Sequence, residues 1–407
     1  MSDKKVILIG FGSYFTDSFQ FFKDKGFELI CIQLTQKVDW FNNYELLKTI
    51  GFKFIHDEPT MSYIKDIELT PNTIILRGTY SGDGDQFPQE IKNICKREME
   101  IFYEFSKKNK LNKNGAKAIL CFCGDNIYKT SKYINWFSEK SKYSNLLLFD
   151  NDLIKKYVTK NIPNLASKKS IIAYFETPLL KNVYHNKSSN INTKEFISLG
   201  RNICSFSIDK YVNIIRFPIK KGIAKNIYED IVYKIKYKTL KNFRKKLKFC
   251  LAGQKEIKVL KKDRELFFNL FQNYAFGISH IYNLFDNDIS NIMKNNELFD
   301  YRCSDFINFD DYKIPQVYTV FNTASKDVTY LMNGIIPIIP HKEHSFYKML
   351  YNKKMAIVVE SINDLKKLYD IDYKEIQEYR DNIYANRDIF TFDHLGEILI
   401  NSLNEIK

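Results

Sequence analysis

The sequence has few of the residues that mark fibrous, disordered or disulfide-bonded proteins. It contains 15 Gly and 9 Pro in 407 residues, too few for a collagen-like repeat or a low-complexity chain. Its 7 cysteines are scattered, and no two of them are separated by two residues, so neither a zinc knuckle nor a disulfide framework is expected. We expect a globular protein of the reducing cytoplasm.

Long hydrophobic segments are also missing. No apolar run approaches the ~18 residues that a transmembrane helix requires. The first residues, MSDKKVILIG, are charged and lead directly into a strand-like segment, which is not the pattern of a secretory signal. We therefore expect a cytoplasmic protein, whose membrane contact would be peripheral, at the inner face of the cytoplasmic membrane.

Positive charge is abundant and local. The chain carries 62 Lys and Arg against 48 Asp and Glu, a net charge of +14, which favours anionic partners. Residues 220–262 hold 15 of the basic and 3 of the acidic residues, so +12 lies in this segment. It is either a solvated lysine-rich helix face or a surface for anionic lipid or a phosphate-bearing acceptor. No nucleic-acid module surrounds it, so nucleic acid is not an expected partner.

The length of 407 residues suits two domains, and the apolar pattern divides accordingly. In residues 1–187, strand-like runs alternate with helical spacing, which predicts a parallel sheet. A polar stretch at 185–193 interrupts this pattern, and residues 193–371 then repeat it. Residues 372–407 show helical spacing alone. We predict an α/β protein of two doubly wound, Rossmann-like domains, with C-terminal helices packing back.

The individual elements can be placed from the same pattern. Strands are expected at 5–9, 28–34, 52–56, 73–76, 118–122, 145–149, 248–253, 316–321, 335–339 and 355–359. Helices are expected at 16–25, 44–50, 91–107 and 328–333.

A glycine turn follows the first strand, at Gly10-Phe-Gly12-Ser13. Such a turn can present backbone N–H groups to an anion or a sugar hydroxyl, or can simply pack a helix on a strand. An NAD or S-adenosylmethionine enzyme should end its second strand with an acidic residue. Here that strand reads CIQLT, which argues against both cofactors.

Three side chains of the first domain are candidates for acid–base or acceptor-binding roles. Asp17, in the first turn of the first helix, could be a general base or could cap the helix. His56, just after the third strand, is the rival base or an ordinary loop histidine. Arg77, after the fourth strand, could hold an anionic acceptor or cap a turn.

An acidic pair, Asp150 and Asp152, follows the apolar run at 146–149. Paired carboxylates in this position can hold a divalent metal against a nucleotide diphosphate. Asp152 is also a natural N-cap for a helix that begins at Leu153. Similar pairs at 83–85 and 286–288 show how easily this spacing arises, so no metal requirement is expected.

The most informative segment spans residues 323–340, where strand, loop, short helix, glycine stop and strand follow one another. Ser325 and Lys326 stand at the start of the short helix. A hydroxyl and an ammonium beside a helix N-terminus form an oxyanion site suited to a diphosphate. Arg201, which follows Gly200 at the end of another strand, is expected to converge on the same anion.

These motifs resemble the GT-B superfamily of nucleotide-sugar-dependent glycosyltransferases, particularly bacterial enzymes of surface-polysaccharide assembly. The likeness is carried by the turn at 10–13, by FISLGR at 196–201, by FCLAG at 249–253 and by the segment from Ser325 to Gly334 and Pro337. It implies two Rossmann-like domains facing a cleft. It also implies sugar transfer from a nucleotide-sugar donor, the co-substrate, to a hydroxyl of a growing capsule or lipooligosaccharide, with a glycan or lipid-linked glycan as acceptor and no required cofactor.

The resemblance also assigns roles to residues. The N-terminal domain would be the acceptor side, with Gly12, Ser13 and Arg77. The donor site would contain Gly200, Arg201, Lys210, Gly253, Ser325, Lys326, Thr329 and Gly334. The paired-glutamate motif of retaining members is missing, so the resemblance implies neither retention nor inversion.

Other functions remain open at this point. A metal-dependent GT-A transferase would use Asp150 and Asp152 and would be one domain built around the first half of the chain. A basic α/β protein that is not an enzyme would bind polyanions or lipid through 220–262. Transfer of another activated group, such as glycerol phosphate, would use the same fold.

Overall fold

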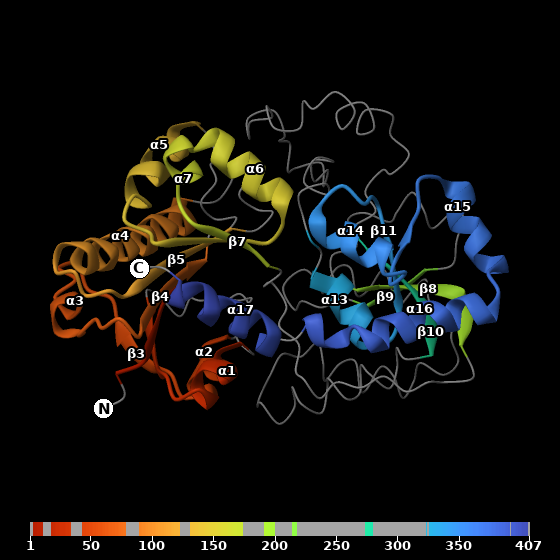
Figure 1. The fold of residues 1–407 in the computed structure, drawn as a ribbon, viewed down its shortest axis with the longest axis horizontal. Helices are drawn as coiled ribbons and strands as arrows, with labels where there is room; N and C mark the ends of the chain where they lie inside the picture. The colour runs from red at the N-terminus through yellow and green to blue at the C-terminus, as the bar shows by residue number, and fades with distance from the viewer. Residues whose placement is uncertain are drawn as a thin grey trace. The chain divides into compact units, whose positions relative to one another are not determined.

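The chain folds into two compact units in a computed structural model (Figure 1). Unit 1 contains Met1–Lys181, Ser290–Thr323 and Asp388–Lys407, and unit 2 contains Asn182–Ile289 and Ala324–Arg387. The structure describes residues 3–10, 18–33, 43–78, 89–122, 131–173, 191–199, 214–217, 273–279, 323, 325–390 and 392–405.

Unit 1 is built on a parallel sheet of seven strands, in the order β3-β2-β1-β4-β5-β6-β7. The strands are β1 (Lys5–Ile9), β2 (Glu28–Gln33), β3 (Lys53–His56), β4 (Thr73–Gly78), β5 (Lys117–Phe122), β6 (Leu146–Phe149) and β7 (Ser170–Ile172). Every residue of β1, β4 and β6 is buried. A strand that is buried on both faces needs helices on both sides, which is why these runs are mostly apolar rather than alternating.

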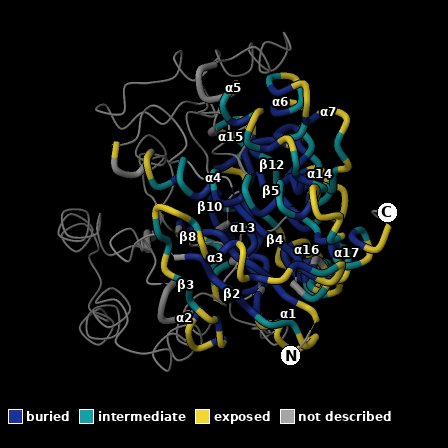
Figure 2. The backbone as a smooth tube through the Cα atoms, turned by 90° about the vertical axis from the view of Figure 1, so that its left-hand side faces the viewer, coloured by how far each residue is buried: buried dark blue, intermediate teal, exposed yellow. Residues whose placement is uncertain are grey.

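Helices cover both faces of this sheet (Figure 1). They are α1 (Ser18–Asp24), α2 (Asn43–Ile50), α3 (Tyr63–Asp66), α4 (Gln89–Leu111), α5 (Ser131–Lys140), α6 (Asp152–Asn161), α7 (Pro163–Ala166) and α17 (Phe392–Asn404). Figure 2 shows the strands in the buried interior and exposed residues along the outer sides of the helices.

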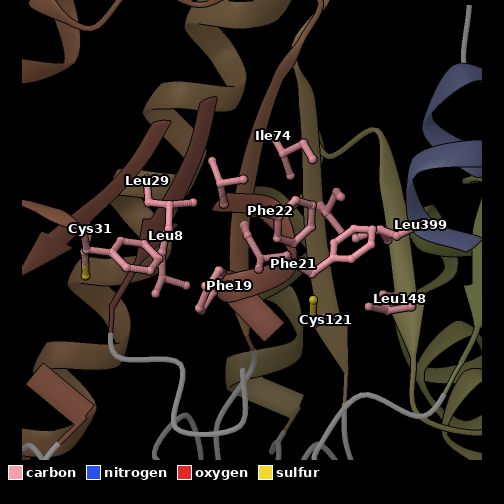
Figure 3. Packing of buried hydrophobic residues seen from close by; sticks show 14 of the residues in the cluster. Leu8, Phe19, Phe21, Phe22, Leu29, Cys31, Ile74, Cys121, Leu148 and Leu399 are labelled. Carbon is pink, nitrogen blue, oxygen red and sulfur yellow. The ribbon is translucent and has the colours of Figure 1, made fainter. Parts of the chain in front are cut away.

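The C-terminal helix α17 packs on α1, nearly four hundred residues earlier in the chain. Phe19, Phe21 and Phe22 of α1 lie in one buried cluster with Leu399 and Leu403 of α17 and with the strand residues beneath them (Figure 3). A Cβ at Gly396 would collide with the ring of Phe21. The glycine therefore allows α17 to approach α1 closely, and the prediction of C-terminal helices that pack back is confirmed.

Unit 2 contains a second parallel sheet, in the order β12-β11-β10-β8-β9. Its strands are β8 (Asn192–Leu199), β9 (Ile214–Phe217), β10 (Tyr274–Ile278), β11 (Ile336–Ile339) and β12 (Ile357–Val358). Its helices are α13 (Ser325–Met332), α14 (Ser345–Asn352), α15 (Ile362–Lys367) and α16 (Tyr373–Ala385), with a short 3-10 turn at Leu368–Asp370; a second 3-10 turn, Arg387–Phe390, spans the boundary with unit 1.

Tyr330 of α13 fixes this helix over the second sheet. Its hydroxyl donates to the carbonyl oxygen of Ile278 at 3.0 Å and lies 3.4 Å from that of Ile197, so it spans β10 and β8. The ring occupies the space above Gly277, where a Cβ would lie 2.6 Å from ring carbons. A larger residue at Gly277 would push α13 away from the sheet.

Most strands that the apolar pattern predicts are present in the described ranges, with ends within a few residues of those expected. The pattern missed β7, β9 and β10. The expected strands at 248–253 and 316–321 lie outside the described residues. Within the described ranges, no helix has the length and hydropathy needed to cross a membrane. The thiols of Cys31, Cys95 and Cys121 are buried and form no disulfide.

Candidate functional site

Each sheet has a point at which the strand order reverses, and ligands of doubly wound proteins bind beyond the carboxyl ends of the strands there. In unit 1 the reversal lies between β1 and β4, which end at Ile9 and Gly78. In unit 2 it lies between β8 and β10, and Ser279 follows β10 directly. Functional side chains are therefore expected at these two switch points.

The switch point of unit 1 contains a buried ion pair. Arg77 of β4 is 0% exposed, and its Nη2 donates to the carbonyl oxygen of Cys95 at 3.0 Å and lies 3.8 Å from Oε2 of Glu98. Cys95 and Glu98 both belong to α4. The guanidinium is thus enclosed within the domain. The structure shows its contacts with α4, and a contact between Arg77 and an acceptor stays a prediction.

Glu98 also explains the glycine that ends the first strand. Gly10 has φ +79°, in the left-handed region, and a Cβ there would fall on the carboxylate of Glu98. Both facts require glycine at this position. Burial, with a smaller effect of Glu98, raises the pKa of the neighbouring Cys31 thiol, so this cysteine stays protonated and unreactive. Gly12, Ser13 and Asp17, which follow in the chain, lie outside the described residues.

The other base candidate, His56, is the last residue of β3 and is exposed. β3 forms the edge of the first sheet, and β2 lies between it and β1. The structure therefore does not place His56 at the switch point of unit 1, and its catalytic role stays a prediction.

The start of α13 forms one side of the carboxyl edge in unit 2. The helix begins at Ser325, as the sequence predicts to within three residues, and ends before Gly334, whose φ of +66° stops it. Lys326 is 5% exposed, and its positive charge favours the ionised form of the neighbouring Asp327 carboxylate, which lowers the pKa of that group. Thr329 lies in the middle of α13. Gly200, Arg201, Lys210 and Gly253 lie outside the described residues.

Asp327 is the centre of a buried polar network that the sequence reasoning did not identify. Its Oδ2 accepts hydrogen bonds from the hydroxyls of Ser279, at 2.7 Å, and Tyr347, at 2.6 Å, and these two oxygens are 3.1 Å apart. Burial raises the pKa of Asp327 to about 6, against the opposing effects of the two hydroxyls and Lys326. The network ties the end of β10 to α13 and α14 beside the helix N-terminus.

Two histidines extend this network along the same edge. His341 follows β11, and His344 caps α14 by accepting from the Tyr347 backbone N–H at 3.2 Å. Nδ1 of His341 accepts from the Glu343 backbone N–H, also at 3.2 Å. The rings of both histidines contact Tyr347, with centroids 5.3 and 4.1 Å away. With Nδ1 as acceptor in each ring, the proton of the neutral imidazole is assigned to Nε2.

This edge of unit 2 is suited to an anion. It combines the N-terminus of α13 with the ammonium of Lys326 and the imidazole groups of two histidines, beside the Asp327 carboxylate that accepts from both hydroxyls, on the strand ends where parallel sheets bind ligands. Ser279 was missed because β10 was not predicted. The signal that could have found these residues is a polar side chain just after a buried strand: Ser279 follows β10 directly, and His341 follows β11 after one proline.

The residue between the two members of the acidic pair, Asn151, has a structural role in unit 1. Asn151, not Asp152, is the N-cap of α6: its Oδ1 accepts from the backbone N–H of Ile154 at 3.0 Å. The interpretation of Asp152 as the cap was therefore wrong by one residue, since α6 begins at Asp152. The Nδ2 of Asn151 donates to the Thr323 hydroxyl at 3.1 Å. No group of three or more metal-ligating side chains occurs among the residues that the structure describes.

Comparison with known proteins identifies the fold. No family model and no curated protein matches the sequence. Among solved structures, the chain is similar to Anabaena Alr3699/HepE, crystallised in complex with UDP and glucose, with a TM-score of 0.52, 8% identity and 99% of each chain covered. The calicheamicin glycosyltransferase CalG4 (TM-score 0.42, 6% identity, 100% of each chain) and a UDP-forming α,α-trehalose-phosphate synthase from Burkholderia xenovorans (0.46, 8%, 100% of this chain and 99% of that one) are less similar.

The two parallel sheets and the similarity to HepE over the whole length confirm the prediction of two Rossmann-like domains in a GT-B fold. A single domain built around the first half of the chain, as the GT-A alternative required, is contradicted by the second sheet.

Proposed function

We propose that the protein is a glycosyltransferase that moves a sugar from a nucleotide-diphosphate donor to an acceptor hydroxyl. The observation that carries the proposal is the start of α13, with Ser325 and Lys326, at the carboxyl edge of the second parallel sheet. The HepE structure, which has the same fold, contains UDP and glucose. UDP-sugars are therefore the first donors to test.

In this proposal, unit 2 stabilises the leaving group. The departing nucleoside diphosphate gains negative charge as the glycosidic bond of the donor breaks. The N–H groups of α13 and the ammonium of Lys326 would balance that charge, and Arg201 and Lys210 would add two further cations. This chemistry needs no metal, and we propose that none is required. Asp17 or His56 would take the proton of the acceptor hydroxyl.

The acceptor belongs to the same proposal. The resemblance of the motifs to enzymes of bacterial surface-polysaccharide assembly favours a growing capsule or lipooligosaccharide, free or linked to a lipid. Such an acceptor suits an enzyme in the cytoplasm that contacts the inner face of the membrane. The segment 220–262, with its net charge of +12, would be one surface for that contact.

A thermal-shift panel of UDP, GDP, CDP and ADP tests donor binding. A ligand that binds only the folded protein, at 100 times its dissociation constant, stabilises it by about 2.7 kcal/mol. We expect one nucleotide to raise the melting temperature clearly and its monophosphate to do so less. If none of them does, while polyanions bind strongly and with salt dependence, the alternative of a non-enzymatic polyanion-binding protein replaces this proposal.

Replacement of Lys326 tests the site itself. Lys326→Met keeps the length of the side chain and removes the charge. We expect it to weaken nucleotide binding by about 10- to 100-fold, since a hydrogen bond to a charged group contributes about 1.5–3 kcal/mol. Titration calorimetry gives the affinity, and circular dichroism checks folding. Lys367→Met, at an exposed lysine of the same unit, is the matched control. Equal affinities of Lys326→Met and wild type would remove Lys326 from the site.

A further inference from the structure

Unit 1 carries a group of lysines and tyrosines on its surface that the proposed function does not use. Lys107, Lys110 and Tyr103 come from α4, and Lys140, Lys142 and Tyr143 come from the end of α5 and the turn that follows it. We call these six residues and Leu111 the lysine–tyrosine patch. Tyr103, Lys107, Lys110 and Leu111 are spaced by four, three and one residues, so they share one side of α4.

The two tyrosines form the centre of the patch. Their ring centroids are 5.4 Å apart. Lys142 Nζ lies 4.9 Å from the centroid of Tyr143 and 5.8 Å from that of Tyr103. Lys140 Nζ and Lys107 Nζ lie 4.7 and 5.7 Å from the centroid of Tyr103. Cation–π contacts of this kind hold the ammonium groups together at the surface against their mutual repulsion.

The charge of the patch is only partly balanced. Two carboxylates lie beside it: Glu104 is 3.9 Å from Lys107 Nζ, and Glu139 is 4.0 Å from Lys140 Nζ. Both distances are too long for hydrogen bonds, and the side chains of Glu104 and Glu139 are 42% and 60% exposed, so these pairs contribute little. Lys168 adds positive charge beside the patch. Its Nζ donates to the Lys142 carbonyl at 2.8 Å, and burial, with a smaller effect of the charge of Lys110, lowers the pKa of Lys168.

The patch lies at the amino edge of the first sheet. α4 ends at Leu111, before β5 begins, and the turn with Lys142 and Tyr143 leads into β6. The switch point of unit 1, with Gly10 and Arg77, lies at the opposite, carboxyl edge. A partner on the patch would therefore leave that edge of unit 1 open.

An apolar side chain stands among these charges. Leu111 is 67% exposed, the largest exposed fraction among the large hydrophobic residues that the structure describes as exposed. Lys110 precedes it, and exposed Lys113 follows in the next turn. An exposed leucine among lysines and tyrosines provides three things: an apolar side chain that can enter a lipid layer, aromatic rings suited to a membrane–water interface, and positive charges for anionic lipid headgroups.

We propose that the lysine–tyrosine patch docks unit 1 on an anionic lipid bilayer. The patch offers lysines and no arginine, and lysine is a hydrated point charge that fits a diffuse anionic surface rather than bidentate phosphate recognition. The exposed Leu111 has no function on a nucleic acid but gains free energy when it enters the interfacial layer of a bilayer. These two features favour a membrane over a nucleic acid.

Vesicle co-sedimentation of the full chain tests the proposal. Phosphatidylcholine vesicles with and without one quarter phosphatidylglycerol are the probes, at low and physiological salt. The variant replaces Lys107, Lys110, Lys140 and Lys142 with Gln. Each lysine near an anionic surface contributes about 1 kcal/mol, so we expect affinity for the anionic vesicles to fall by two to three orders of magnitude. The control variant replaces Lys348, Lys353, Lys367 and Lys374 of unit 2, which are exposed, and so changes the net charge equally.

Both variants keep segment 220–262 unchanged, so the difference between them reports on the patch alone. Leu111→Ser should weaken binding about tenfold at equal charge. Equal vesicle affinity of the patch variant and the control variant would overturn the proposal. So would patch-dependent binding of poly(U) RNA without binding of vesicles, which would assign the surface to nucleic acid. The response to nucleotides should be the same in both variants, so failure here is separate from failure of the proposed donor site.

Discussion

The switch points of the two units hold a buried carboxylate in different ways. In unit 1, Glu98 faces the guanidinium of Arg77 and fills the place where Gly10 lacks a side chain. In unit 2, Asp327 accepts from the neutral hydroxyls of Ser279 and Tyr347. For Asp327, the neutral hydroxyls and Lys326 do not outweigh burial, which raises its pKa to about 6. The first arrangement fixes structure, and the second keeps a titratable group beside a helix N-terminus.

Arg77→Met should have the largest effect. It leaves Glu98 as a buried charge without its guanidinium, and the loss of one partner of a buried ion pair costs about 3–5 kcal/mol. Urea denaturation of the two proteins at pH 7 measures the difference in unfolding free energy. Arg97→Met is the control, because Arg97 pairs with Asp57 at 2.8 Å in a partly exposed position, and it should cost less. A cost below about 1 kcal/mol for Arg77→Met would mean that the ion pair does not stabilise unit 1.

Asp327→Asn should change how stability depends on pH. The folded protein holds a proton on Asp327 up to about pH 6, whereas an unfolded aspartate loses it near 3.8. The native state therefore binds more protons between these values, and its stability falls as pH rises through this range, by about 3 kcal/mol in total. The asparagine variant lacks this loss. Its unfolding free energy relative to wild type should increase by about 2 kcal/mol, most of that total, from pH 4 to pH 7, as measured by urea denaturation.

Asp364→Asn supplies the control for this slope. Hydrogen bonds from Lys367 and Ser361 lower the pKa of Asp364. Wild type therefore gains unfolding free energy from this group as pH rises. The Asp364→Asn variant lacks that gain, so its unfolding free energy relative to wild type should fall with rising pH, opposite to Asp327→Asn. Parallel pH curves for wild type and Asp327→Asn would show that Asp327 does not titrate in this range.

Tyr347→Phe should have a smaller effect. It removes the hydroxyl that donates to Asp327 at 2.6 Å and should cost about 2 kcal/mol, the usual range for a hydrogen bond to a charged group. It should also raise the pKa of Asp327 further, so the loss of unfolding free energy with rising pH should extend to a higher pH than in wild type. Tyr351→Phe, at an exposed tyrosine of the same helix, is the control.

A double-mutant cycle of Tyr347→Phe with Ser279→Ala shows whether the network acts as a unit. Both hydroxyls bond the same carboxylate oxygen, so their effects should not add. Additive effects in the cycle would mean that the two hydroxyls act independently.

The sequence predicted the elements around the site better than the site itself. β1, β4, β5 and β6 are short, mostly apolar runs between helices, the pattern typical of buried parallel strands. β10 was missed because its sequence, YAFGI, contains a glycine that reads as a turn. Only the ring of Tyr330, above Gly277, explains that glycine.

The residues of the polar network could not be brought together from sequence. Ser279, Asp327 and Tyr347 are separated by 48 and 20 positions. Asp327 lies within the segment from Ser325 to Gly334, but no motif with a fixed spacing links it to Ser279 or Tyr347. Their contact depends on the order of β10 and β11 in the sheet and on the placement of α13 and α14 over it, neither of which a local pattern specifies.

The sequence by itself determined the alternation of strands and helices, the start of α13 to within three residues and the glycine that ends it, because these depend on neighbours within a few residues. The tertiary structure decided that α17 returns to α1, that Glu98 lies where Gly10 has no side chain and that Asp327 is buried beside two hydroxyls. Such contacts join residues far apart in the chain. They follow from the shapes and volumes that pack together, which no periodicity along the sequence records.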